Sequence, residues 1–352
     1  MSPAHRAAPL LLGWLLCVPL AAGGAEALRV LLREERGPLR VAGAEVEAAG
    51  PGLAVAGRRV GPRWRAPGPG PHRVGGLEVR GEVWVERAGP ALRVLNRVSL
   101  ESYLAGTLGR EIYASWSRAA LRAQAVVSRT YALYQRATYG ERGFDVEADT
   151  SHQVYGGLAA ESAPVRRAVA DTRNQVLVWR GQPILAAFHS ASGGRTASSE
   201  EVWGQRLPYL RSLSVEGEEK SPDTYWRTRV SKTKLGRALA PLGLDLGAIR
   251  GARVVERSAS GRVLGVEVAG SRDSGRLAGR ALRSALGADI LRSTLFELRD
   301  DGEALIFVGS GHGHGVGMSQ WGAQAMAERG ASHAEILAAF YPGTELVQWS
   351  PK

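Results

Sequence analysis

The sequence predicts a mixed α/β fold of the α+β kind, in which a β-rich N-terminal part precedes a helix-and-hairpin part. Three observations predict this class. Short β-prone runs, apolar or alternating, dominate residues 28–98. Patterns with a helical period begin near Leu100 and return at the end of the chain. Between them, strand and helix patterns interleave without the regular βαβ alternation of a parallel sheet.

The first part, residues 28–98, is expected to consist of short strands. Apolar or alternating runs bounded by charged or turn residues predict four of them, at residues 28–32, 53–56, 82–86 and 91–98. Residues 61–71 hold seven Gly or Pro residues, so they are expected to form a loop.

The second part, residues 99–349, is expected to contain helices and hairpins. Cap residues and apolar periodicity predict helices at residues 117–137, 164–171, 235–240, 279–286, 319–329 and 332–340. The last two have clear boundaries, because Gly330 is a favoured helix terminator and Ser332 with Glu335 forms a capping box. Residues 180–182 and 259–261 each separate two β-prone runs and predict hairpins.

Composition limits the class of protein. The chain has 352 residues, of which 44% are hydrophobic and 22% are charged, so global disorder is excluded. No apolar run reaches the ~20 residues of a membrane-spanning helix. The formal net charge of +11 favours an anionic partner, which could be nucleic acid, a membrane surface or an acidic polymer. The single cysteine, Cys17, excludes an internal disulfide and a cysteine-based zinc cluster.

The N-terminus predicts where this charge acts. Residues 1–27 have the pattern of a secretory signal peptide, because His5 and Arg6 precede an apolar stretch that ends in small residues near Ala25. Cleavage after Ala25 removes residues 1–25, which takes away Cys17 and lowers the net charge to +10. We therefore expect an exported protein of the periplasm or cell envelope, without a membrane span once the signal is removed. Its anionic partner is then an envelope polymer rather than nucleic acid. An uncleaved anchor is the alternative.

Common catalytic signatures are absent, since the chain has no G-x-S-x-G elbow, no H-E-x-x-H helix and no G-x-x-x-x-G-K loop. Three unusual stretches remain, at residues 100–131, 189–196 and 311–323. In the first, Gln124 and Arg129 lie inside an apolar helix, where polar side chains are either hydrogen-bonded core members or site residues. In the third, alternating glycines open onto a helix N-terminus, which favours a polar or anionic group nearby.

Further motifs accompany these stretches in a fixed order. They are residues 100–104 (LESYL), Glu111, residues 123–131 (AQAVVSRTY), residues 149–155 (DTSHQVY), residues 193–196 (GGRT), residues 202–204 (VWG), residues 311–320 (GHGHGVGMSQ) and residues 341–344 (YPGT). This order resembles the SpoIID/LytB family, which contains stage II sporulation protein D and relatives called amidase enhancers. The resemblance covers residues 28–346 as one SpoIID-like module. The chain departs from the family at residues 112–114, where the family has a methionine-proline turn.

The resemblance implies an exported peptidoglycan lytic transglycosylase that acts on glycan strands, preferably those stripped of stem peptides. Glu111 falls on the family's acid/base residue. It would protonate the bond between N-acetylmuramic acid (MurNAc) and N-acetylglucosamine (GlcNAc), then accept the proton of the MurNAc O6 hydroxyl, giving a 1,6-anhydro product. The residues expected to bind substrate are Gln124, Arg129, Tyr155, Ser192, Gly193, Gly194, His314, Ser319 and Gln320.

Alternatives stay open for the function and for the cofactor. The departure at residues 112–114 leaves a non-catalytic, peptidoglycan-binding amidase enhancer as the second function, with a cell-wall amidase as partner. No cofactor or metal is expected. Zinc is the weaker alternative, because zinc-binding family members carry cysteines near the position of His152 and the mature chain has none. Stripped glycan is a polyanion, and residues 28–100, with 13 Arg against 7 Glu, are candidates to hold it.

Overall fold

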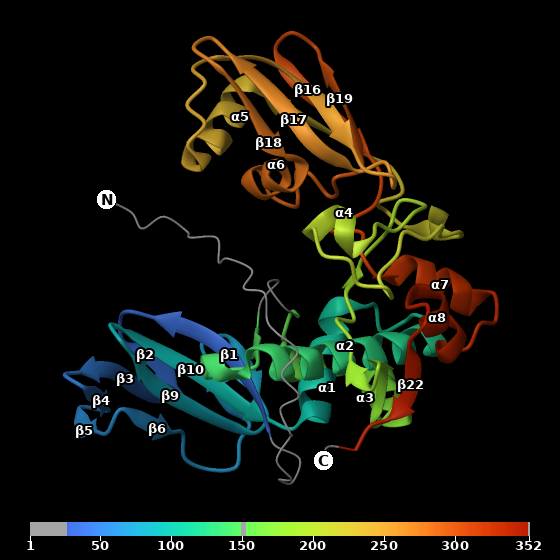
Figure 1. The fold of residues 1–352 in the computed structure, drawn as a ribbon. Helices are drawn as coiled ribbons and strands as arrows, with labels where there is room; N and C mark the ends of the chain where they lie inside the picture. Colours follow the sequence, from blue (N-terminus) through green and yellow to red (C-terminus); the bar gives the residue numbers. More distant parts are fainter. Residues whose placement is uncertain (1–26, 149–152, 351–352) are drawn as a thin grey trace.

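The computed structural model describes residues 27–148 and 153–350, and it confirms the predicted α+β class. Figure 1 shows a β-rich part at the lower left, a helical part at the lower right and a second β-rich lobe at the top. Residues 1–26 of the predicted signal peptide lie outside the described residues, as do residues 149–152 of the DTSHQVY motif.

The N-terminal β-rich part consists of two sheets. One has the strand order β11-β1-β10-β9-β6 and the other has the order β5-β4-β3-β2-β7-β8. The strands are Leu28–Glu35 (β1), Leu39–Val41 (β2), Ala44–Ala49 (β3), Gly52–Val55 (β4), Arg58–Val60 (β5), Arg63–Arg65 (β6), His72–Val74 (β7), Leu77–Val79 (β8), Glu82–Ala88 (β9), Ala91–Val98 (β10) and Val146–Glu147 (β11). The four strands predicted here are confirmed.

The prediction of a loop over residues 61–71 was wrong for strand β6. Its backbone pairs antiparallel with β9, so that Trp64 lies opposite Val85. Backbone hydrogen bonds to a strand 20 residues further along the chain outweigh the local turn signals of Gly and Pro. Strand β6 therefore forms the edge of the five-stranded sheet.

The helical part is arranged around one long helix. Its elements are Leu100–Glu111 (α1), Arg118–Tyr139 (α2), Gly140–Arg142 (η1), Gly157–Ala160 (η2), Ala163–Asp171 (α3), Gln175–Trp179 (β12), Gln182–Pro183 (β13), Phe188–His189 (β14), Ser199–Trp203 (α4), Glu218–Lys220 (η3), Met318–Ser319 (β21), Gln320–Glu328 (α7), His333–Phe340 (α8) and Glu345–Gln348 (β22). The predicted capping box at Ser332 is present. The predicted hairpin after β12 pairs over two residues only, because the chain then leaves to pair β14 with β21.

Helix α2 is buried on two faces, which explains its apolar sequence. One face packs with α1, α3 and the N-terminal sheets through residues such as Leu121 and Ala125. Another face packs with β12, α7 and α8 through Val126 and Val127. A helix that is apolar around most of its circumference is stable in water only when it is enclosed in this way.

Residues 226–309 form the lobe at the top of Figure 1. It has two three-stranded sheets, β15-β20-β19 and β16-β17-β18, and its own cluster of buried apolar side chains. The elements are Trp226–Ser231 (β15), Lys232–Leu239 (α5), Ala240–Leu242 (η4), Ile249–Arg257 (β16), Val263–Gly270 (β17), Ser274–Ala278 (β18), Gly279–Leu286 (α6), Phe296–Asp300 (β19) and Ala304–Gly309 (β20). The predicted hairpin and both predicted helices are confirmed here.

Two glycines of α1 let the following chain approach the helix closely. A Cβ atom at Gly106 would lie 2.6 Å from the ring of Tyr155, and one at Gly109 would overlap the carbonyl oxygen of Ala160. Because neither glycine has a side chain, the segment that holds Tyr155 and η2 lies directly against α1. This contact places Val154 beside the end of α1.

We expect Gly109→Ala to lower the free energy of unfolding by at least about 2 kcal/mol, because the methyl group overlaps backbone that cannot move freely. Gly236→Ala in α5 is the control, since the nearest atom there belongs to the Ile249 side chain at 3.5 Å. This second change should raise the free energy of unfolding by about 0.5–1 kcal/mol through helix propensity. Urea denaturation measures both, and equal effects would contradict the close contact at α1.

Candidate active site around Glu111

Glu111 is the last residue of α1, and its carboxylate is partly buried. Its Oε1 atom accepts a hydrogen bond from the backbone N–H of Val154 at 2.6 Å. Burial raises the pKa of Glu111 to about 7, although the hydrogen bond from Val154 acts in the opposite direction. The exposed side chain of Arg110 lies against Gly156 and is not among the causes of this pKa shift. A carboxyl group with such a pKa can both donate and accept a proton near neutral pH.

Gln320 connects Glu111 to two other segments of the chain. Its Nε2 atom donates to the backbone carbonyl of Glu111 at 2.9 Å and to Oε1 of Gln124 at 3.3 Å. Gln124 in turn donates to Ser128 one turn further along α2. The structure thus brings together Glu111, Gln124 and Gln320, three residues predicted for the site, at the meeting point of α1, α2 and α7.

An aromatic cluster lies beside this meeting point. Trp116 and Trp321 are in edge contact, with ring centroids 4.6 Å apart, and Tyr113 lies 5.4 Å from the first ring and 6.2 Å from the second. Tyr113 is 60% exposed although it directly follows the α1 cap. Aromatic side chains together with a few polar groups are typical of sites that bind small molecules.

A second group of predicted residues surrounds Glu218, a residue that was not predicted for the site from the sequence. Its buried carboxylate accepts hydrogen bonds from the backbone N–H of Ser192 at 2.8 Å and of Gly194 at 3.0 Å. The hydroxyl groups of Ser192 and Ser319 donate to it as well. Glu218 lies in a run of acidic residues, which in sequence has the pattern of a solvated surface, so no local signal marks it. Because Ser319 precedes Gln320, this group adjoins the one around Glu111.

The other predicted residues of the glycine-rich segments lie close to this second group. Gly193 and Gly194 line a pocket of about 140 Å³ together with Glu218. His314 is in ring contact with Trp203 and with His189, at centroid distances of 5.4 and 5.7 Å. Burial lowers the pKa of His314 to about 4, so the imidazole is neutral at pH 7.

The side chains of Arg129 and Tyr155 are both buried in the interior. The guanidinium of Arg129, 1% exposed, forms two hydrogen bonds with Glu101 at 2.8 and 2.9 Å. The hydroxyl of Tyr155 donates to Asn96, and its ring stacks on Tyr103. Both side chains are thereby engaged within the protein. Glu101 belongs to the LESYL motif, which was the available signal for a partner of Arg129.

Zinc was the weaker alternative that the sequence left open for this site. Within residues 27–148 and 153–350, no three His, Cys, Asp or Glu side chains gather as a metal site requires. His312 pairs with Asp223, which also binds Arg292. His152 lies outside the described residues. Likewise, among the helices that the structure describes, none is long and apolar enough to cross a membrane.

These features define an α+β protein with a partly buried acid between α1 and α7. The chain belongs to the SpoIID family. The family profile described as stage II sporulation protein matches residues 88–179, and a profile for a domain of unknown function, DUF8618, matches residues 198–317. The second match includes the whole upper lobe, residues 226–309.

Several curated proteins are similar to this chain. Stage II sporulation protein D of Bacillus amyloliquefaciens is 32% identical over 274 residues, which cover 72% of this chain and 75% of the relative. Its Bacillus subtilis counterpart is 31% identical over 278 residues, covering 73% and 78%. The amidase enhancer of Bacillus subtilis is 30% identical over 294 residues, covering 70% of this chain but only 40% of that longer protein. The predicted family is therefore confirmed.

We expect Glu111→Gln to stabilise the protein at pH 8 and to have no effect below pH about 4. The folded-state pKa of about 7 lies above the ordinary value of 4.5. The protonated form therefore stabilises the fold fully below the ordinary pKa, and this contribution is lost as pH rises through about 7. One pKa unit corresponds to about 1.4 kcal/mol, so a partly exposed group should give about 1–3 kcal/mol. Urea denaturation at both pH values measures this difference, and a pH-independent effect would contradict the raised pKa.

We expect Arg129→Lys to lower the free energy of unfolding by about 2–4 kcal/mol, because lysine cannot reproduce the paired hydrogen bonds to Glu101. The dissociation constant for glycan should stay unchanged at temperatures where the variant is folded. Calorimetric unfolding and glycan titration measure the two quantities separately. Weaker glycan binding by a fully folded variant would instead place Arg129 in contact with substrate.

Proposed function

We propose that this protein is an exported lytic transglycosylase of the cell envelope, which cleaves the MurNAc–GlcNAc bonds of peptidoglycan. The observation that supports this most directly is Glu111, a partly buried carboxyl group with a pKa raised to about 7. Membership of the SpoIID family and the aromatic cluster beside this acid point in the same direction. We further propose that the preferred substrate is glycan stripped of its stem peptides.

One carboxyl group is sufficient for this reaction. Protonated Glu111 donates its proton to the glycosidic oxygen, the bond from that oxygen to C1 of MurNAc breaks, and GlcNAc leaves with a free hydroxyl. The O6 hydroxyl of MurNAc then bonds to C1 and releases its proton to the Glu111 carboxylate. The products are a 1,6-anhydro end and the original protonated enzyme. No water is consumed, so no second carboxylate is needed to activate one.

The surroundings of Glu111 suit both proton transfers. Burial favours the neutral acid before the first transfer, and the N–H of Val154 stabilises the carboxylate after it. Gln320 binds the backbone carbonyl of Glu111 rather than its carboxyl group. We assign Gln124 and Gln320 as positioning residues for the acid.

A second candidate is a non-catalytic role in which the protein binds peptidoglycan and stimulates a cell-wall amidase. The name of the Bacillus subtilis amidase enhancer favours it. So does the turn at residues 112–114, which differs from the methionine-proline turn of the family. This candidate predicts glycan binding without cleavage, and amidase stimulation that survives Glu111→Gln.

The transglycosylase proposal is tested by incubating the protein with peptide-free glycan strands and identifying products by mass spectrometry. We expect 1,6-anhydro ends from the wild type, and a loss of at least about 100-fold in kcat for Glu111→Gln, because the proton donor is gone. For the wild type, kcat/KM should fall as pH rises above about 7, where the acid loses its proton.

The matched control is Glu200→Gln, an exposed glutamate of α4 outside the site. Its activity should equal that of the wild type. Reducing ends in place of anhydro ends would identify a hydrolase. Full activity of Glu111→Gln would remove this residue from catalysis, and amidase stimulation without cleavage would favour the second candidate.

A further inference from the structure

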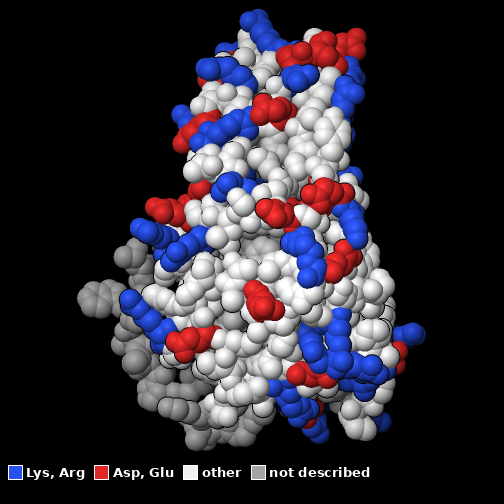
Figure 2. All heavy atoms as spheres, turned by 90° about the vertical axis from the view of Figure 1, so that its right-hand side faces the viewer, with Lys and Arg blue, Asp and Glu red and all other residues white. Residues whose placement is uncertain are grey.

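More than half of the arginines in the N-terminal part already bind carboxylates of the protein. Seven of the thirteen arginines in residues 28–100 form ion pairs with carboxylates, namely Arg29, Arg33, Arg63, Arg65, Arg80, Arg93 and Arg97. On the face shown in Figure 2, basic and acidic side chains are interspersed from the upper lobe to the helical part. We therefore looked for arginines that line a pocket and lack a carboxylate partner of their own.

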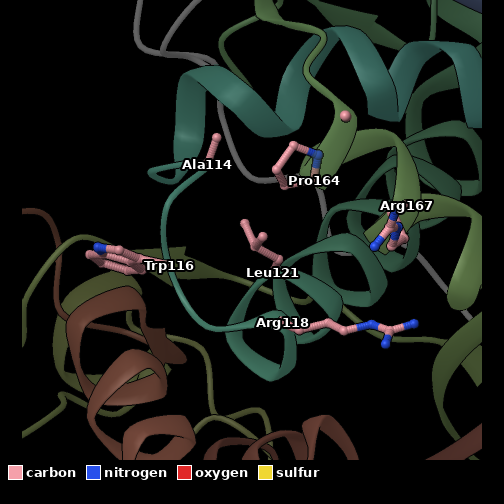
Figure 3. A pocket seen from close by; sticks show the side chains of 7 residues that line it. Ala114, Trp116, Arg118, Leu121, Pro164 and Arg167 are labelled. Atoms are coloured by element: carbon pink, nitrogen blue, oxygen red, sulfur yellow. The ribbon is translucent and has the colours of Figure 1, made fainter.

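One pocket provides this arrangement. It has a volume of about 280 Å³ and lies between the loop after Glu111 and the first turns of α2 and α3. Figure 3 shows Trp116 at one end of the pocket, Arg118 and Arg167 at the other, and Leu121 between them. A ligand that fills it therefore meets an aromatic ring at one end and positive charge at the other.

The charged end of the pocket has an excess of arginine. Arg118 and Arg122 share a single carboxylate oxygen of Asp171, with Nη2 distances of 2.7 and 2.8 Å. Arg167 lines the pocket, and no carboxylate of the described residues pairs with its guanidinium. The residues that line the pocket include two arginines and no acid. A carboxylate on a ligand would complete the pairing, because guanidinium groups bind carboxylates through paired hydrogen bonds.

The remaining lining of the pocket is apolar. Leu121 and Ala114 form an apolar wall together with Pro164. The ring of Trp116 is held in place by its edge contact with Trp321. Such a surface suits the apolar face of a sugar ring, since sugar sites combine aromatic walls with a few polar anchors.

The pocket adjoins the proposed catalytic acid. Ala114 and Trp116 belong to the loop that begins directly after Glu111, and Trp321 follows the residue that binds the Glu111 carbonyl. We propose that this pocket is a subsite for a MurNAc residue next to the cleaved bond, with Arg167 and Arg118 binding its free lactyl carboxylate. This inference rests on the proposed function and names the residues that give it specificity.

Specificity follows from the chemistry of the lactyl group. In peptide-bearing glycan this group is an amide, which carries no charge and leaves the excess arginine charge uncompensated. In stripped glycan it is a carboxylate, which gains charge-assisted hydrogen bonds. The pocket therefore selects stripped strands through the charge of one group on the sugar.

The test measures binding by calorimetry in the Glu111→Gln background, where no glycan is cleaved. The ligands are a peptide-free MurNAc–GlcNAc tetrasaccharide, its lactyl amide and a GlcNAc tetrasaccharide. We expect the carboxylate form to bind about tenfold more tightly than the other two, a difference typical of hydrogen bonds to a charged group. Arg167→Gln should abolish this preference and leave binding of the GlcNAc tetrasaccharide unchanged.

Arg166→Gln is the matched control, because this exposed neighbour on α3 does not line the pocket and should keep the preference. Circular dichroism verifies that each variant is folded. The subsite is overturned if Arg167→Gln keeps the preference, if it weakens all three ligands equally, or if a phosphate-bearing wall polymer binds this pocket more tightly than the sugar carboxylate. A preference that depends on Arg167 in a protein that forms no 1,6-anhydro ends would support the subsite and refute the transglycosylase.

Discussion

The contact between Gln320 and the end of α1 is the constraint on which the site depends. One amide nitrogen binds the carbonyl of Glu111 and the side chain of Gln124, so two consecutive helices meet a third helix about 200 residues further along the chain. A helix end needs partners for its last carbonyl groups. Here α7 supplies one of them, and the position of the acid is thereby tied to the glycine-rich loop that precedes α7.

Two carboxylates near this point have opposite surroundings. Glu218 accepts hydrogen bonds from two backbone N–H groups and two hydroxyl groups, which compensate its buried charge. Glu111 accepts one, so burial dominates and its pKa rises to about 7. The hydrogen bonds of Glu218 thus connect Ser192, Gly194 and Ser319, whereas the carboxyl group of Glu111 has a single backbone donor.

Much of the local structure was predictable, because helix caps, turns and apolar periodicity depend on residues that are close together in the sequence. The helix over Gly279–Leu286, the hairpin around Gly261 and the capping box at Ser332 all occur as predicted. Strand β6 was not predictable, since it depends on pairing with β9. The separate apolar core of residues 226–309 was not predicted either, because apolar patterns do not show which helix packs against which sheet.

The sequence by itself determined the fold class, the family and the segments that form the site, because ordered motifs and periodic patterns are local properties of the chain. Only the tertiary structure decided which polar residues face each other. In the folded chain, Arg129 binds Glu101 in the interior. The hydroxyl groups of Ser192 and Ser319 donate to Glu218, and Arg167 lines an open pocket. These outcomes depend on burial and on partners distant in the chain, which set the charge and the pKa of a side chain but leave no local pattern.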